Sequence, residues 1–290
     1  MGDYLIRGIP KKLNFRFFGV FLPRTIEEIR RLQKLSPVAT AALGRALAGA
    51  ALLSADLKFG RVFLQISGDG PLGEILAEAS ASGDLRGMVR NPAVFLPVNE
   101  KKLPVGKAVG KNGFLNVIKD YGLKERYQSS IELLTGEIAE DLAYYLTVSE
   151  QVPSACTLGV LVGKDGQVLQ AGGFLIQKLP ETTDEEINLL EEKLAKLPHL
   201  TTLLDRGLNI EKILEDLLGE LEILERREIR FKCSCSKDRV KDSLVVLGKK
   251  ELCDILVEKK PLEVSCEFCK RTYEIAPEEL EEIVENIRNY

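Results

Sequence analysis

Four cysteines near the end of this 290-residue chain form two closely spaced pairs. The first pair reads Cys233-Ser-Cys235, the second reads Cys266-Glu-Phe-Cys269, and thirty residues separate them. Two such pairs can surround one tetrahedral metal ion, and thiolate ligands favour zinc. A disulfide within the Cys-x-Cys pair would close a small, strained ring, and strained disulfides are the labile ones. The spacing therefore predicts one zinc ion per chain, held at a site that is open to oxidation.

The residues after the second pair favour a zinc knuckle over a catalytic dithiol. Lys270–Ile275 alternate as a strand does. A thioredoxin-type Cys-x-x-Cys would instead open a helix, where the helix dipole lowers the thiol pKa. The two remaining cysteines, Cys156 and Cys253, lie among apolar residues, and we predict a structural role for both.

Catalytic and nucleotide-binding motifs are missing from the sequence. The single histidine, His199, follows Pro198 at an apparent helix break, and we predict that it lies on the surface. Gly68-Asp-Gly-Pro-Leu-Gly73 matches the pattern G-x-G-x-x-G, but only Glu74–Ser80 separate it from the next turn. That is too short for the crossover helix of a dinucleotide-binding unit. We therefore predict neither a nucleotide cofactor nor an enzyme.

Charge and hydropathy indicate a cytoplasmic protein without a membrane partner. The formal net charge is -4, and the N-terminus has no apolar segment of signal-peptide length. No run approaches the roughly 20 apolar residues of a membrane span. Cysteines normally stay reduced in the cytoplasm, which favours metal binding or redox sensing over permanent disulfides.

A basic stretch raises the alternative of a zinc ribbon that binds nucleic acid. Basic residues cluster between Arg226 and Lys250, around the first cysteine pair. The following stretch, Glu251–Tyr290, is strongly acidic, and no aromatic residues alternate with the basic ones for stacking on bases. We therefore expect a solvated charged face and no nucleic-acid partner.

The order of the elements predicts an α+β fold with three parts. Residues 1–178 form a large domain of helices and mostly antiparallel sheets, residues 179–225 a helical linker, and residues 226–290 a small zinc-binding domain. In the linker, apolar residues recur at helical spacing and Thr183 can cap the first helix. In the small domain an acidic amphipathic helix starts near Pro277.

Several elements of the large domain can be placed more closely. Val38–Leu57 is rich in alanine and leucine and predicts a long buried helix. Thr25 is the expected cap of the helix before it. We also predict two hairpins: Glu74–Ala79 with Leu85–Arg90, and Thr157–Val162 with Gln167–Ile176.

Taken together, these motifs resemble the redox-regulated thirty-three-kilodalton heat-shock chaperone family of bacteria. Besides the cysteine pairs and the leucine-rich linker, four stretches look like that family's, in the same order. They are Ala42-Leu-Gly-Arg45, Gly68-Asp-Gly-Pro-Leu-Gly73, Ser149-Glu-Gln-Val-Pro-Ser154 and Gly172-Gly-Phe-Leu-Ile-Gln177. The resemblance covers essentially the whole chain.

The resemblance implies a chaperone that holds unfolding client proteins without ATP. In the family, the reduced form binds zinc on four thiolates and is inactive toward clients. Oxidation forms disulfides within the pairs, here Cys233–Cys235 and Cys266–Cys269, and releases the metal. The family also forms homodimers when active. Two rival hypotheses stay open: a nucleic-acid-binding zinc ribbon, and a thiol–disulfide oxidoreductase that uses Cys266 and Cys269.

Overall fold

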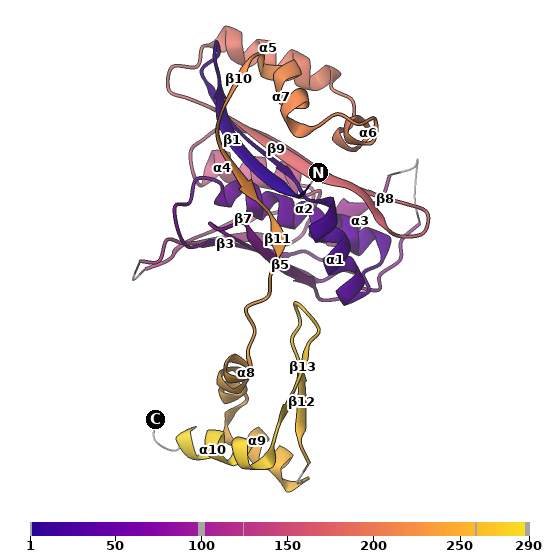
Figure 1. Ribbon diagram of the computed structural model, residues 1–290, viewed down its shortest axis with the longest axis vertical. Coiled ribbons are helices and arrows are strands. Elements are labelled where there is room, and N and C mark those ends of the chain that lie inside the picture. The colour runs from indigo at the N-terminus through magenta and orange to yellow at the C-terminus, as the bar shows by residue number, and fades with distance from the viewer. Residues whose placement is uncertain (1, 98–101, 124, 259, 288–290) are drawn as a thin grey trace. The chain divides into compact units, whose positions relative to one another are not determined.

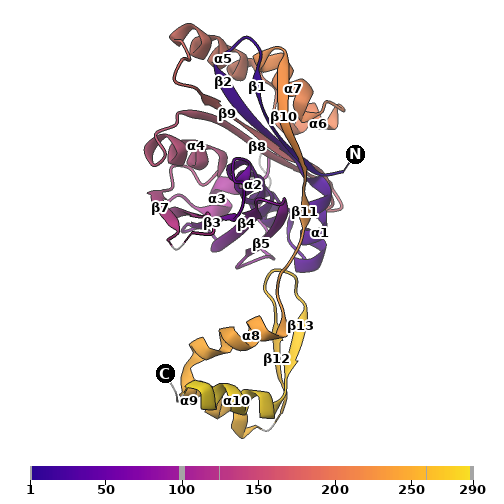
Figure 2. The ribbon, with the colours of Figure 1, turned by 60° about the vertical axis from the view of Figure 1, so that its left-hand side comes forward.

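A long apolar helix lies between two β-sheets in the first of the chain's two units, Met1–Lys232 (Figures 1 and 2). The computed structural model describes residues 2–97, 102–123, 125–258 and 260–287. The helix, α2 (Pro37–Ser54), begins after Ser36, whose side chain accepts a hydrogen bond from the backbone N–H of Ala39. It is long and apolar enough to span a membrane, but 89% of it is buried inside the protein. The predicted buried helix is therefore confirmed, as a core helix.

Small residues let α2 approach its neighbours closely. A Cβ added at Gly49 would lie 2.3 Å from a methyl carbon of Leu142, and one added at Gly44 would lie 2.7 Å from a methyl carbon of Val160. Both distances are shorter than real contacts between carbon atoms, so a side chain at either position would force Leu142 or Val160 to move within the packed core.

The two sheets are predominantly antiparallel, which confirms the predicted α+β class. The first has the strand order β10-β1-β2-β9-β8 and the second the order β11-β5-β4-β3-β6-β7, in which only β11 pairs in parallel with its neighbour. Both predicted hairpins are present, as β4 with β5 and as β8 with β9. The strands of the first sheet are β1 (Tyr4–Pro10), β2 (Phe15–Phe21), β8 (Ser154–Val162), β9 (Val168–Lys178) and β10 (Leu221–Glu228). Those of the second are β3 (Arg61–Ser67), β4 (Glu74–Ser80), β5 (Asp84–Val89), β6 (Phe114–Asp120), β7 (Tyr127–Glu132) and β11 (Arg230–Phe231).

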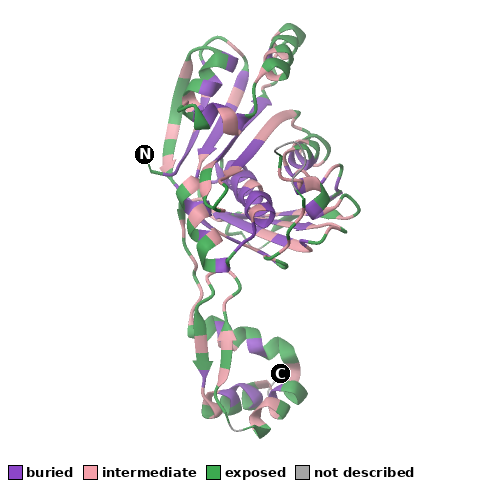
Figure 3. Cartoon of the chain, turned by 90° about the vertical axis from the view of Figure 1, so that its right-hand side faces the viewer, coloured by how far each residue is buried: buried purple, intermediate pink, exposed green. Residues whose placement is uncertain are grey.

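Alternate residues of the first sheet enter two different hydrophobic cores. Leu5 and Phe18 belong to the core around α2, whereas Ile6 and Phe17 belong to a second core on the opposite face. Figure 3 shows the buried residues concentrated along α2 and these strands. Both faces of the sheet are therefore covered, which explains its apolar strands.

Three short helices cover the outer face of the first sheet. They are α5 (Asp184–Lys196), α6 (Leu200–Asp205) and α7 (Ile210–Leu218). Thr183 caps α5 as predicted, in a reciprocal pair of hydrogen bonds with Glu186. The predicted apolar stripe of α7 is fully buried against the sheet; its residues are Ile210, Ile213, Leu214, Leu217 and Leu218.

The cap predicted at Thr25 was wrong. The remaining helices of this unit are α1 (Pro23–Gln33), α3 (Val105–Val109) and α4 (Ala139–Val148), and α1 already begins at Pro23. The carboxylate of Asp3, which precedes β1, accepts hydrogen bonds from the backbone N–H groups of Arg24 and Thr25 at 3.3 and 2.6 Å. A side chain distant in sequence therefore takes the place of the local cap.

The second unit, Cys233–Tyr290, has a small core of its own. Its elements are α8 (Lys237–Leu244), a 3₁₀ turn (Val245–Leu247), α9 (Gly248–Val257), β12 (Leu262–Ser265), β13 (Thr272–Ile275) and α10 (Pro277–Ile287). The strand predicted after Cys269 and the helix predicted at Pro277 are both confirmed, as β13 and α10. Among the described residues only seven apolar side chains of this unit are buried: Val240, Leu244, Leu252, Ile275, Leu280, Ile283 and Val284.

Candidate metal centre

The loop that carries the first cysteine pair is held by the start of α8. Ser236 caps this helix by accepting a hydrogen bond from the backbone N–H of Arg239 at 3.3 Å. The guanidinium of Arg239 reaches back to donate to the carbonyl and hydroxyl oxygens of Ser234, at 2.9 and 2.6 Å. Ser234 separates Cys233 from Cys235, so these contacts fix the turn between the two thiols.

The second cysteine pair lies in the turn between β12 and β13. The strands pair in antiparallel register up to Ser265 and Thr272. Beyond them, the N–H of Cys266 donates to the carbonyl of Arg271, and the N–H of Lys270 donates to the carbonyl of Cys266, at 2.9 and 2.8 Å. Lys270 adopts a left-handed conformation with φ of 57°, which closes the turn and directs both thiols to the same side.

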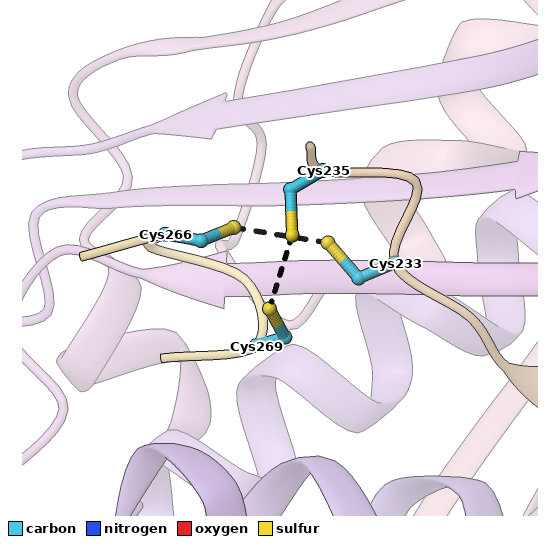
Figure 4. A group of neighbouring side chains, drawn as sticks. All are labelled: Cys233, Cys235, Cys266 and Cys269. Carbon is cyan, nitrogen blue, oxygen red and sulfur yellow. Dashed lines mark hydrogen bonds between the residues drawn. The ribbon is translucent and has the colours of Figure 1, made fainter. Parts of the chain in front are cut away.

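The two pairs meet in a compact group of four thiols, here named the thiol cluster: Cys233, Cys235, Cys266 and Cys269 (Figure 4). Their sulfur atoms all lie within 4.8 Å of one another. The Sγ atoms of Cys233 and Cys266 are 3.7 Å apart, and those of Cys235 and Cys269 are 3.4 Å apart. A tetrahedron with zinc–sulfur distances of about 2.3 Å has edges of about 3.8 Å. The thiol cluster therefore fits one tetrahedral zinc ion.

The electrostatics of the thiol cluster favour a bound cation. Burial raises the pKa of Cys233, and it raises the pKa of Cys269 to about 12 with support from the neighbouring sulfur atoms. Burial also opposes ionisation of Cys235, but hydrogen bonds from Tyr273 and the other thiols outweigh it and lower the pKa of Cys235 to about 7. Cys235 therefore loses its proton more readily than Cys233 and Cys269 do. A divalent metal would offset the negative charge of the thiolates, because coordinated thiols are deprotonated outright.

One neighbour of the thiol cluster was not anticipated from the sequence. The hydroxyl of Tyr273, on β13, donates a hydrogen bond to the Sγ of Cys235 at 3.0 Å. The alternating pattern of Lys270–Ile275 predicted a strand there, but the pattern does not say which of its side chains reaches a sulfur atom.

The other cysteines and the histidine lie outside the thiol cluster. Cys253, on α9, packs against the core of the second unit. Cys156, on β8, packs against the core around α2, and burial raises its pKa to about 12, so it is a poor nucleophile. His199 is exposed before α6, as predicted.

The basic residues near the first cysteine pair are engaged in contacts within the second unit. Lys237 and Lys241 both form ion pairs with Glu279 of α10, at 2.6 and 2.8 Å, and Arg239 is bonded to Ser234. These three cations are therefore engaged in local contacts within the second unit.

The whole chain resembles proteins of one family. Residues 3–276 match the family model described as "Hsp33 protein". A 33 kDa chaperonin of Thermodesulfovibrio yellowstonii is 43% identical over 98% of this chain and 100% of its own, and one of Agathobacter rectalis is 45% identical with the same coverage. The crystal structure of the 33 kDa chaperonin of Thermotoga maritima covers 100% of both chains with a TM-score of 0.90 and 39% identity.

Proposed function

Since this chain belongs to the Hsp33 family of redox-regulated chaperones, we propose that the thiol cluster holds its zinc ion and is its redox switch. The protein is a holdase and not an enzyme, and its partners are client proteins. The observation that supports the proposed switch is the tetrahedral spacing of four sulfur atoms that come from two separate turns.

In the reduced state the thiol cluster joins the first loop to the β12–β13 turn. A bound zinc ion supplies folding energy on the order of 10 kcal/mol in small modules of this kind. The second unit depends on this contribution, because the seven apolar side chains that are buried among its described residues make too small a core for a stable fold. Loss of the metal is therefore expected to unfold residues 233–290.

Oxidation by a hydroperoxide converts the four thiols into two disulfides. Each disulfide forms as two thiols lose two electrons and two protons, while one peroxide bond is reduced to two molecules of water or to water and an alcohol. We propose the pairing Cys233–Cys235 and Cys266–Cys269. Although sulfur atoms of the two turns lie 3.7 and 3.4 Å apart, those contacts exist only while the unit is folded. Sulfurs two or three residues apart stay close in the unfolded chain, since short loops cost little entropy to close.

The client-binding surface that we propose is the apolar side of α5–α7 together with the sheet face beneath it. Both sides of this contact are rich in large apolar residues, including Phe17, Phe174 and Leu214. Separation of the helices would expose a contiguous apolar area, which is the feature that unfolded proteins bind. The strands β10 and β11 connect α7 to the thiol cluster. When the second unit unfolds, these strands lose the folded structure that follows them in the chain.

The functional division that we propose follows from these roles. Residues 1–178 form the core domain, residues 179–225 the linker that is released, and residues 226–290 the redox-switch domain. We further propose that the active protein is a homodimer and that it works in the cytoplasm, where reduced cysteines and zinc prevail until oxidative stress.

The experiment that tests this function compares reduced, zinc-loaded protein with peroxide-treated protein. We expect only the oxidised form to suppress light scattering by a heat-unfolding client. Zinc release should follow thiol loss, with one ion released for four thiols lost. Cys253→Ser is the matched control and should behave as the native chain does. Equal and negligible protection by both redox forms would refute the proposal.

A further inference from the structure

The hydroxyl of Tyr273 links the two halves of the thiol cluster. It extends from β13, which follows Cys269, and donates to the sulfur of Cys235 in the opposite loop at 3.0 Å. The side chain is partly buried and packs against the core of the second unit, which fixes the direction of its hydroxyl. The hydroxyl is therefore oriented toward one particular sulfur.

We propose that Tyr273 is a positioning residue that sets how readily Cys235 is oxidised. This inference rests on the proposed role of the thiol cluster as a redox switch. A hydrogen bond to a thiolate withdraws electron density from the sulfur and occupies one of its lone pairs. It also holds the Sγ of Cys235 inside the thiol cluster, as residues that hydrogen-bond to metal ligands generally do.

The effect on reactivity follows from the chemical step. A lone pair of the Cys235 sulfur attacks one oxygen of a hydroperoxide, the oxygen–oxygen bond breaks, and the leaving oxygen takes a proton to become water or an alcohol. The resulting sulfenic acid is attacked by the thiolate of Cys233, a disulfide forms, and the departing hydroxide is protonated to water. A metal-bound sulfur is already deprotonated, so the Tyr273 hydrogen bond then acts only by lowering the nucleophilicity of the sulfur, and it opposes the first step. Its removal should accelerate oxidation of Cys235 by about tenfold.

The decisive variant is Tyr273→Phe, which removes the hydroxyl and keeps the ring. The matched control is Thr272→Val on the same strand. Thr272 shares a hydrogen bond of 3.0 Å with Ser265, so this control removes a hydroxyl from the β12–β13 pair without touching a sulfur atom. Co²⁺ replaces zinc as the probe, because its thiolate charge-transfer band reports the electron density on sulfur.

In Tyr273→Phe we expect the charge-transfer band to move to lower energy and chelator competition to show about tenfold weaker Co²⁺ binding. Alkylation resolved by site should show about tenfold faster peroxide oxidation at Cys235 than in the native chain. Thr272→Val should leave all three measurements unchanged.

The outcomes separate this inference from the proposed function. A native chain that shows no thiolate–cobalt band would refute the metal site itself. If the native chain shows the cobalt band while Tyr273→Phe changes neither that band nor the oxidation rate of Cys235, the result would overturn only the inference about Tyr273. Equal acceleration at all four cysteines without a band shift would also overturn it, because that pattern reports loosening of the fold.

Discussion

The contact that holds α7 to the sheet provides the sharpest test of linker docking. Glu211, in the first turn of α7, accepts a hydrogen bond from the hydroxyl of Tyr4 on β1 at 2.6 Å. It also accepts one from the guanidinium of Arg226 on β10 at 2.6 Å, and that guanidinium lies 4.0 Å from the centre of the Tyr4 ring. One carboxylate therefore joins three elements.

The free energy of docking that is lost with this carboxylate can be calculated from how exposed its hydrogen-bond partners are. A hydrogen bond to a charged, partly buried acceptor contributes about 1.5 to 3 kcal/mol, and this range applies to the Tyr4 contact. The Arg226 pair contributes less, about 0.5 kcal/mol, because the arginine side chain is 46% exposed and solvent screens it. Glu211→Ala should therefore weaken the docking of α7 by about 2 kcal/mol, or about 30-fold in equilibrium.

The assay is amide hydrogen exchange in the reduced, zinc-loaded protein. We expect amides in the last turn of α7 to exchange about 30-fold faster in Glu211→Ala than in the native chain. The matched control is Glu215→Ala on the same helix. Glu215 is exposed, and its ion pair at 3.7 Å is with Lys212 of the same helix, so exchange should change little. Less than threefold acceleration in Glu211→Ala, or equal acceleration in both variants, would refute the reasoning.

Three further predictions concern separate parts of the chain. Cys269→Ser removes one member of the thiol cluster, so zinc binding and amide protection of the second unit should both be lost while the core around α2 stays protected; retained stoichiometric zinc would contradict this. Hydrogen bonds from Arg30, together with the backbone N–H of Val168, lower the pKa of Glu27 to about 2 against the opposing effect of burial. Because folding lowers this pKa, the stability that the Glu27 carboxylate contributes is present above the unfolded value of 4.5 and is lost as the pH falls toward 2. The urea midpoint should therefore fall less steeply with acid in Glu27→Gln than in the native chain. Lys270→Gly removes the backbone strain of a left-handed lysine and should stabilise the zinc-loaded second unit by up to about 1 kcal/mol. Its melting temperature should therefore rise, and a lower melting temperature would show that the lysine is not strained.

The thiol cluster could be predicted from sequence because its information is local. The spacing of Cys233 from Cys235, and of Cys266 from Cys269, already places two sulfurs on each turn. The Tyr273 contact could not be predicted, because it depends on how the first loop meets β13 across 38 residues of sequence. Alternation in a strand gives the face of a residue but not its partner.

The strand β10 escaped prediction for a related reason. Leu221–Glu228 is rich in charge, and most of its residues are exposed or only half-buried, so its apolar pattern is weak. It forms because β1, more than 200 residues earlier, offers an unpaired edge, and because Arg7 and Glu225 pair across the two strands at 2.8 Å. Such long-range pairing overrides local propensity.

The same weakness makes the segment between α7 and the thiol cluster the part of the first unit most open to regulation. The helices α5–α7 are held by buried apolar side chains, which oxidation does not alter. The strand β11, in contrast, has two residues, and its ion pairs from Arg230 and Lys232 to Asp84 are more than half exposed on the basic side. Exposed pairs contribute little stability. If residues 233–290 unfold on oxidation, β11 has little to hold it, whereas β10 stays paired with β1 along Tyr4–Pro10 and is also anchored through Arg226 and Glu225. The route that we propose from the thiol cluster to the client-binding surface therefore begins at β11, the weaker of the two strands, and passes through β10 to the Glu211 contact of α7.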